Sequence, residues 1–241
     1  MARTDGRADD ELRPVRFVVD FIIYPEGSVL VEMGGTRVLC NVSVEEKVPA
    51  WRAASGGGWL TAEYAMLPRA THTRTPRSTS AEGARSQEVR RFVGRALRAA
   101  LDLERLGSRT LTVDCDVLQA DGGTRTAAVT GGYVAVALAL WRMIKAGDLA
   151  PDVWVTPVAA VSVGIVQGRR LLDLCYAEDV SADADLNVVM TGDGRFVEVQ
   201  GTAEGSPFER SALDELLDLA ARGIKQLLPC QAHALAEVGV Q

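Results

Sequence analysis

The order of local patterns along the chain constrains its fold most, because strand-like segments followed by a helical segment occur twice. In the first half, strand patterns over residues 16–48 and 109–120 precede an apolar helical stretch that ends near Gly147. In the second half, strand patterns over residues 157–201 precede a helical pattern that begins near Ser211. Two β-rich halves, each closed by helices, predict an α+β fold with an internal duplication.

The first half opens with three predicted strands, RFVVDFIIY from residue 16, SVLVEM and TRVLCNVSV, all rich in β-branched or aromatic residues. The last two flank Gly34 and Gly35, a pair suited to a tight hairpin. From Ala53 to Ala84 the periodicity is lost, and Gly, Ser, Thr, Pro and Arg accumulate. This composition predicts a long loop, which in a compact domain is often functional.

Three helices are expected. Apolar residues at helical spacing predict an amphipathic helix over residues 85–103, and Ser211 with Asp214 is typical of a capping box at the start of the last helix. The stretch 127–144 is apolar on all sides and predicts a buried helix. Because it contains two glycines, a Trp and an Arg, we do not expect it to span a membrane.

Length and composition predict a single domain over residues 1–241, with 47% hydrophobic residues and no case for wholesale disorder. A net charge of −6 excludes a protein that coats nucleic acid over its whole surface, so any basic site must be local. The four cysteines lie far apart and the first residues are too charged for a signal peptide, which favours a cytoplasmic protein.

The first candidate site is basic. Eight arginines lie between residues 69 and 98, against only Glu82 and Glu88. In the predicted loop, the guanidinium groups of Arg69, Arg74 and Arg77 are suited to follow a phosphate backbone. A solvated charged surface is an equally good interpretation of the composition alone.

The second candidate is the turn DGGTRT at residues 121–126, where a strand passes into a helix. Gly123 and its neighbouring glycine let the backbone approach a ligand, the helix start offers unpaired N–H groups near Thr124, and Arg125 adds a positive charge. Phosphate fits such a turn. The sequence is neither a Walker A motif nor a dinucleotide fingerprint, so an ordinary glycine turn is the alternative.

The third candidate is acidic and comprises Glu178, Asp179, Asp183 and Asp185, between two predicted strands. Oxygen ligands at this density suit Mg²⁺, and Asp179 with Asp185 is the better pair. A solvated polar turn is the alternative. With no G-x-S-x-G elbow and no His and Cys set at zinc spacing, the three candidates together favour phosphoryl or nucleotidyl transfer by positioned charge.

Five blocks occur in one order along the chain: DGR, ELRPV, GWLTAEYAMLPRAT, VDCDVLQADGGTRTA and NVVMTGDGRFVEVQGTAEG. Through these blocks the sequence resembles the RNase PH family of phosphorolytic exoribonucleases over nearly its whole length. The resemblance implies a phosphate-dependent 3′→5′ exoribonuclease that trims tRNA precursors, releases nucleoside diphosphates and also runs in reverse. Inorganic phosphate is then the co-substrate and Mg²⁺ the metal; whether Mn²⁺ substitutes for it stays open.

The resemblance also implies roles for residues. Arg85, Thr124 and Arg125 match the family's phosphate site, with Gly123 beside them, while Asp179 and Asp185 match its catalytic and metal-linked aspartates. Arg69, Arg74 and Arg77 fall in the family's tRNA-binding loop.

The implied fold is the ribosomal protein S5 domain 2-like fold, and the implied assembly is a ring-shaped homohexamer, a trimer of dimers. Two residues depart from the family pattern: Cys175 stands where Asp is common, and Ala84 replaces Gly before Arg85. The alternatives are a non-catalytic RNA-binding ring subunit of an exosome-like assembly and a metal-dependent hydrolase that uses water.

Overall fold

The computed structural model describes residues 3–54, 56–77 and 83–240 and contains two β-sheets. The five-stranded sheet consists, in spatial order, of β1 (Val15–Val19), β2 (Gly27–Met33), β3 (Thr36–Glu45), β5 (Thr110–Gln119) and β4 (Trp59–Met66). Its pairs are antiparallel except for β4 and β5, which run parallel. The four-stranded sheet is antiparallel and consists of β7 (Arg169–Leu172), β6 (Val158–Val166), β8 (Ala184–Thr191) and β9 (Phe196–Ala203).

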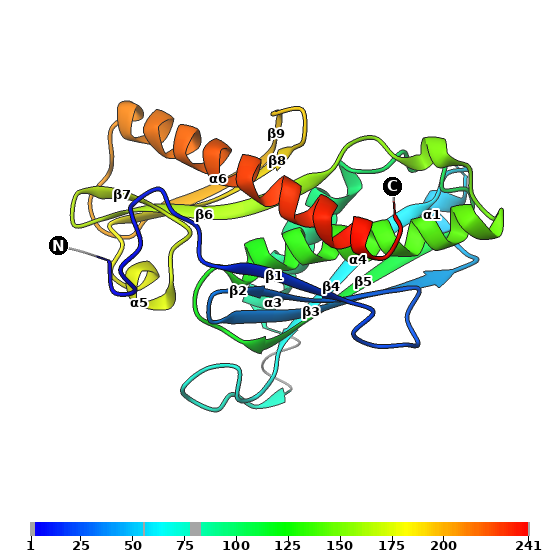
Figure 1. Cartoon of the computed structure of the whole chain (residues 1–241), viewed down its shortest axis with the longest axis horizontal. Coiled ribbons are helices and arrows are strands. Elements are labelled where there is room, and N and C mark those ends of the chain that lie inside the picture. Colours follow the sequence, from blue (N-terminus) through cyan, green and yellow to red (C-terminus); the bar gives the residue numbers. More distant parts are fainter. Residues whose placement is uncertain (1–2, 55, 78–82, 241) are drawn as a thin grey trace.

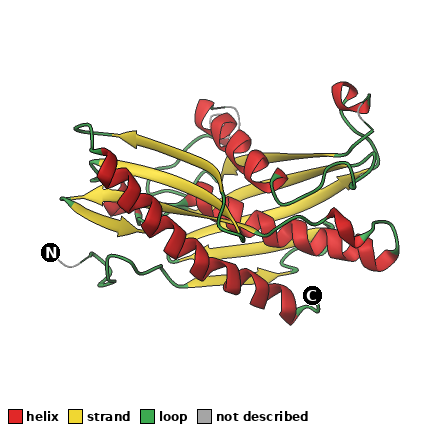
Figure 2. Cartoon of the chain, turned by 90° about the horizontal axis from the view of Figure 1, so that it is seen from above, coloured by secondary structure: helices red, strands yellow, loops and turns green. Residues whose placement is uncertain are grey.

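Helices pack against both sheets. They are α1 (Ala50–Ala53), α3 (Ala84–Arg98), α4 (Thr124–Ala146), α5 (Tyr176–Asp179) and α6 (Arg210–Glu237), together with a 3-10 turn at Pro151–Val153. α4 packs on β2 and β3 of one sheet and on β6 of the other, and α6 packs across the four-stranded sheet and β1. Figures 1 and 2 show α4 inside the molecule, with the long α6 along its outside. The predicted α+β class is therefore confirmed.

The apolar sequence of α4 explains its central position. A helix that is apolar on every side is stable only when it is covered all round. By length and composition α4 would also be able to cross a membrane, but 83% of its most apolar window is buried inside the protein. Gly131 allows β2 to approach closely, because a Cβ there would lie 2.5 Å from Cγ1 of Val31. One hydrophobic cluster draws on both sheets and on α3, α4 and α6.

The hairpin expected at Gly34 and Gly35 is present, with Met33 paired to Thr36 and Gly34 at φ 58°. The sequence predicts one long loop over residues 53–84, and this prediction is wrong for the middle of the segment. Residues 59–66 form β4, whose alternate residues Leu60, Ala62 and Tyr64 are buried. The period-two pattern was present, but the surrounding Gly, Ser and Pro masked it. Residues 55 and 78–82 of that segment lie outside the described chain.

Two further expectations need correction. The strand expected to run to Tyr24 ends at Val19, because Asp20 adopts φ 57° and the chain leaves the sheet with Tyr24 88% exposed. The capping box expected from Ser211 and Asp214 is absent, because no side chain caps the start of α6. Asp214 instead accepts a hydrogen bond from Arg210. The prediction that residues 1–241 form a single domain stays a prediction.

Candidate active site

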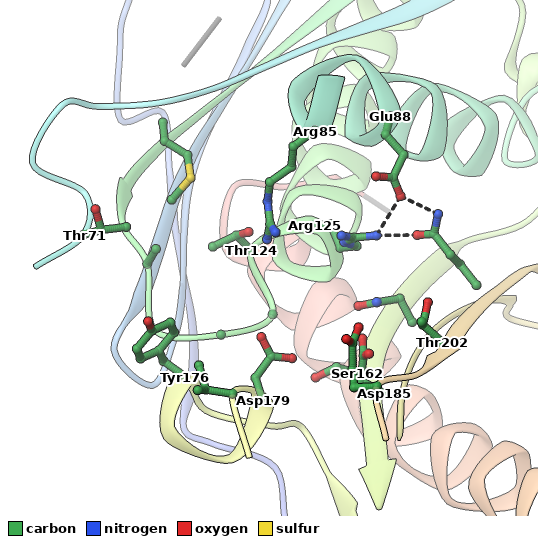
Figure 3. Close-up of a pocket in the computed structure, with 18 of the residues that line it drawn as sticks. Thr71, Arg85, Glu88, Thr124, Arg125, Ser162, Tyr176, Asp179, Asp185 and Thr202 are labelled. Atoms are coloured by element: carbon green, nitrogen blue, oxygen red, sulfur yellow. Dashed lines mark hydrogen bonds and ion pairs between the residues drawn. The ribbon is translucent and has the colours of Figure 1, made fainter. Parts of the chain in front are cut away.

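A cavity of about 770 Å³ lies where the two halves of the chain meet. Its walls come from the first turns of α3 and α4, from α5, and from β8 and β9. Figure 3 shows charged side chains from α3, α4, α5 and β8, and polar side chains from β9, pointing into one space. Six residues singled out in the sequence line this cavity: Arg85, Gly123, Thr124, Arg125, Asp179 and Asp185.

The glycine turn before α4 has the backbone that the sequence predicts. Gly122 and Gly123 have φ of 74° and 64°, a region that favours glycine. A Cβ on Gly122 would lie 2.5 Å from the carbonyl oxygen of Leu174. Because the first N–H groups of a helix lack intrahelical partners, the start of α4 offers donors to an anion at the cavity wall.

Buried side chains hold this turn from behind. Thr36 Oγ1 donates to the Gly122 carbonyl at 2.6 Å, and the Asp121 N–H donates to Thr36 at 2.9 Å. The Arg13 guanidinium donates to the Asp121 carbonyl at 2.5 Å and forms a buried ion pair with Asp173 at 2.6 Å. A fully paired buried cation resists displacement, so the turn has a fixed position.

Arg125 is held by two residues that the sequence analysis did not single out as site residues. Its Nη1 donates to Gln200 Oε1 and lies 3.2 Å from Glu88 Oε1, while Gln200 Nε2 donates to the same Glu88 oxygen at 2.6 Å. Figure 3 draws this triangle. Because Glu88 lies on α3 and Gln200 on β9, contacts from both halves fix the guanidinium, and no sequence spacing signals that convergence.

Arg85 enters the cavity from the first turn of α3, and its side chain points toward Thr124 (Figure 3). Tyr64, buried beneath, donates to Thr124 Oγ1 at 2.8 Å. Burial raises the pKa of Tyr64, against the hydrogen bond to Thr124 and the positive charges of Arg85 and Arg125. Two guanidinium groups from distant parts of the chain therefore act on one buried phenol.

Asp179 on α5 and Asp185 on β8 lie across the cavity from the arginines, and both are half-buried. Burial raises the pKa of Asp179, and the charges of Arg85 and Arg125 oppose this rise. Burial also raises the pKa of Asp185, and the negative charge of Asp179 raises it further. The two carboxylates repel each other, so a cation bound between them would be favourable. The two arginines across the cavity would in the same way favour a bound anion.

The other two members of the predicted acidic cluster face elsewhere. Glu178 is buried and accepts from Arg3 at 2.8 and 2.7 Å, and Asp183 is exposed outside the cavity lining. Burial alone would raise the pKa of Glu178, but the hydrogen bonds from Arg3 and the Cys175 N–H lower it overall. Cys175 lies 3.7 Å from Thr4 Oγ1 and outside the cavity lining, so it does not change the number of cavity carboxylates.

The three loop arginines do not line the cavity. Arg69, Arg74 and Arg77 are all exposed on the segment that follows β4, which projects beyond the sheet in Figure 1. Residues 71–73 of the same segment do line the cavity. These arginines therefore lie on the same segment as three residues that line the cavity.

The cavity also contains suitable ligands for Mg²⁺, the metal that the resemblance implies. Among the described residues no group of three or more His, Cys, Asp or Glu is arranged to hold a metal ion. Mg²⁺ does not need such a group, since it usually takes one or two carboxylates and completes its shell with water and substrate phosphates. Asp179 and Asp185, with the charge of Glu204 acting on both, therefore fit Mg²⁺.

Arginines for an anion, a glycine turn at a helix start and a carboxylate pair are typical of enzymes that transfer phosphoryl or nucleotidyl groups by alignment and charge. Comparisons with known proteins name the family. Residues 11–140 match domain 1 and residues 156–223 match domain 2 of the 3′ exoribonuclease family, RNase PH. The chain belongs to the RNase PH family.

Relatives and solved structures agree with this assignment. The chain is 59% identical to Ribonuclease PH of Nocardia farcinica, over 97% of this chain and 92% of the relative. It is 53% identical to Ribonuclease PH of Bacillus subtilis, over 98% and 97% of the two chains. Among solved structures, the Archaeoglobus fulgidus exosome with RNA bound to the active site matches with a TM-score of 0.79 and 25% identity, over 95% of this chain and 92% of that one.

The rice protein Rrp46 matches with a TM-score of 0.78 at 16% identity, over 97% of this chain and 100% of that one, and shows the fold alone. The predicted family, the S5 domain 2-like fold and the assignment as a phosphorolytic 3′→5′ exoribonuclease are confirmed. Inorganic phosphate is its co-substrate and RNA its substrate.

Proposed function

We propose that the cavity is the place where inorganic phosphate attacks the last phosphodiester bond of a tRNA precursor. An oxygen of phosphate forms a bond to the scissile phosphorus, and the bond from that phosphorus to the 3′ oxygen of the preceding nucleotide breaks. The products are a nucleoside diphosphate and an RNA shortened by one nucleotide with a free 3′ hydroxyl. The observation that carries this proposal is the meeting of Arg85, Arg125, Asp179 and Asp185 in one cavity.

The residues of the chain act by alignment. Arg85, Arg125, the Thr124 hydroxyl and the N–H groups at the start of α4 hold the phosphate with an oxygen directed at the scissile phosphorus. Charge-assisted hydrogen bonds of this kind contribute about 1.5 to 3 kcal/mol each. The fixed positions of Arg125 and of the glycine turn mean that little reorganisation is needed when the phosphate binds.

Asp179 and Asp185 would hold Mg²⁺, which when bound would offset the negative charge on the leaving 3′ oxygen. Both carboxylates belong to the wall opposite the arginines, so the RNA phosphate would lie between the two charged groups.

The product identifies the reaction. With 3′-extended tRNA and added phosphate, nucleoside diphosphates should accumulate, and without phosphate the rate should fall to background. Thin-layer chromatography of labelled 3′ ends separates diphosphates from monophosphates. Monophosphates released without phosphate would show hydrolysis by water, and no release under either condition would favour a non-catalytic RNA-binding subunit. The retained cavity residues argue against that alternative.

The arginine loop is expected to hold the body of tRNA outside the cavity. Changing Arg69, Arg74 and Arg77 together to Ala should weaken tRNA binding roughly 10-fold or more at low salt and flatten the dependence of affinity on salt concentration. Cleavage of short oligonucleotides should be spared, because these residues do not line the cavity. Filter binding at several salt concentrations measures the slope, and Arg105→Ala, at an exposed arginine far along the chain, serves as the control. If the dependence of tRNA affinity on salt concentration does not change, the three arginines belong to a solvated surface and do not contact the RNA.

We further propose that the protein acts in the cytoplasm as a ring-shaped homohexamer, a trimer of dimers. The likeness to a chain of the Archaeoglobus fulgidus exosome, which is itself a multi-chain assembly, supports assembly into a complex. Exposed apolar side chains away from the cavity, Phe21, Ile23 and Tyr24, are suited to contacts between copies.

A further inference from the structure

The cavity has aromatic and apolar side chains that the phosphate chemistry does not use. Met66, His72, Tyr176 and Val180 line it together with the charged groups. Figure 3 shows Tyr176 across the cavity from Glu88 and Arg125, with Asp179 beside it. A substrate whose phosphate lies against the arginines would therefore present its remaining part, the sugar and the base, to a wall of a different chemical character.

Tyr176 is fixed in place yet exposed. It is the first residue of α5, its N–H donates to Asp121 Oδ1 at 3.2 Å, and 52% of its surface is exposed. A tyrosine that is exposed on a short helix gains little stability from its ring. Because Asp179 ends the same helix, the ring and the carboxylate have fixed positions relative to each other.

His72 faces Tyr176 from the loop that follows β4. The two ring centroids lie 6.4 Å apart, and the ring planes are inclined by 55°. This separation lies in the range of a direct contact between tilted aromatic rings, so a base enters between them only when one ring moves. His72 is exposed on its loop, so its side chain can rotate away from Tyr176 and bring the two ring planes nearer to parallel around a base.

We propose that Tyr176 and His72 form a base clamp, which takes the 3′-terminal nucleobase of the RNA between its rings. The inference rests on the proposed function of the cavity and adds to it the subsite for the terminal base. Stacking accepts all four bases because each has a π face. An enzyme that removes successive nucleotides needs that tolerance, and the clamp places each new terminal phosphodiester beside Asp179 and the arginines.

The test compares two RNAs that differ only at the last nucleotide, which carries adenine in one and is abasic in the other. Single-turnover phosphorolysis at saturating phosphate gives the ratio of their kcat/KM values. The wild type should prefer the adenine end by roughly 10- to 100-fold, within the range expected for one base–aromatic stack. Tyr176→Ala should lose most of this preference and process the abasic RNA at the wild-type rate, while Tyr176→Phe should keep the preference. His72→Ala should lose part of it.

A binding measurement separates failure of the clamp from failure of the phosphorolysis proposal. An RNA that ends in fluorescent 2-aminopurine, added without phosphate, should be quenched by the wild type and by Tyr176→Phe but not by Tyr176→Ala. Phe196→Ala, at an aromatic residue outside the cavity whose exposure is similar to that of Tyr176, should leave both the quenching and the adenine preference unchanged. A Tyr176→Ala variant that slows both RNAs equally, or that keeps the quenching, would overturn the clamp.

Discussion

Arg125→Ala is expected to lower the rate of phosphate-dependent cleavage by at least about 100-fold, because it removes one of the two guanidinium groups that hold the attacking anion. The variant also removes the contacts of Arg125 with Glu88 and Gln200, so the Glu88 carboxylate, which keeps its hydrogen bond from Gln200 but loses its cation, would then face the incoming phosphate. We therefore expect a large rise in KM for phosphate as well as a fall in kcat. Initial rates over a range of phosphate concentrations separate the two effects.

The stability of that variant should change little. The Glu88 side chain that pairs with Arg125 is 42% exposed, and ion pairs of this exposure contribute less than about 1 kcal/mol. Arg91→Ala is the matched control, since Arg91 is an exposed arginine of the adjacent α3 that does not line the cavity. A fully active Arg125→Ala enzyme would remove Arg125 from the phosphate site, and a variant that fails to fold would be recognised by its circular dichroism and replaced by Arg125→Gln.

The parts of the site that are local in sequence were the ones the sequence could predict. The glycine turn is such a case, because glycine adopts positive φ without steric cost and two glycines before a helix therefore allow a tight turn at an exposed helix start. The carboxylate pair is another, since Asp179 and Asp185 lie six positions apart across one short connection.

The support of Arg125 was not predictable in this way. Glu88 and Gln200 come from different halves, and only the packing of β9 near the start of α3 brings them together. The strand β4 was missed for a related reason. Its residues pair in parallel with β5, more than 40 positions further along the chain, and no hairpin turn marks such a pairing. Long-range geometry, rather than local preference, decides both features.

Asp185→Asn is expected to lower turnover by about 100-fold or more and at the same time to stabilise the folded protein. The loss of turnover follows because the substitution removes one of the two carboxylates that fit Mg²⁺. The gain in stability follows from the pKa of Asp185, which burial and the charge of Asp179 raise above its ordinary value of 3.8. The folded protein therefore holds this proton to higher pH than the unfolded chain does, and wild-type stability falls as the pH rises through that interval.

Asparagine cannot ionise and escapes this loss. The variant and the wild type should thus have similar melting temperatures below about pH 3.8, and the variant should gain as the pH rises above it. Because Asp185 is only half-buried, we expect a rise of roughly 1 to 3 °C at neutral pH. Thermal unfolding without metal, from acidic to neutral pH, measures the difference.

The control is Asp183→Asn, two residues away and exposed outside the cavity, which should change neither the rate of turnover nor the melting temperature. If Asp185→Asn and the wild type are equally stable at neutral pH, burial does not raise the pKa of Asp185. If the variant keeps the wild-type rate of turnover, Asp185 does not hold the metal.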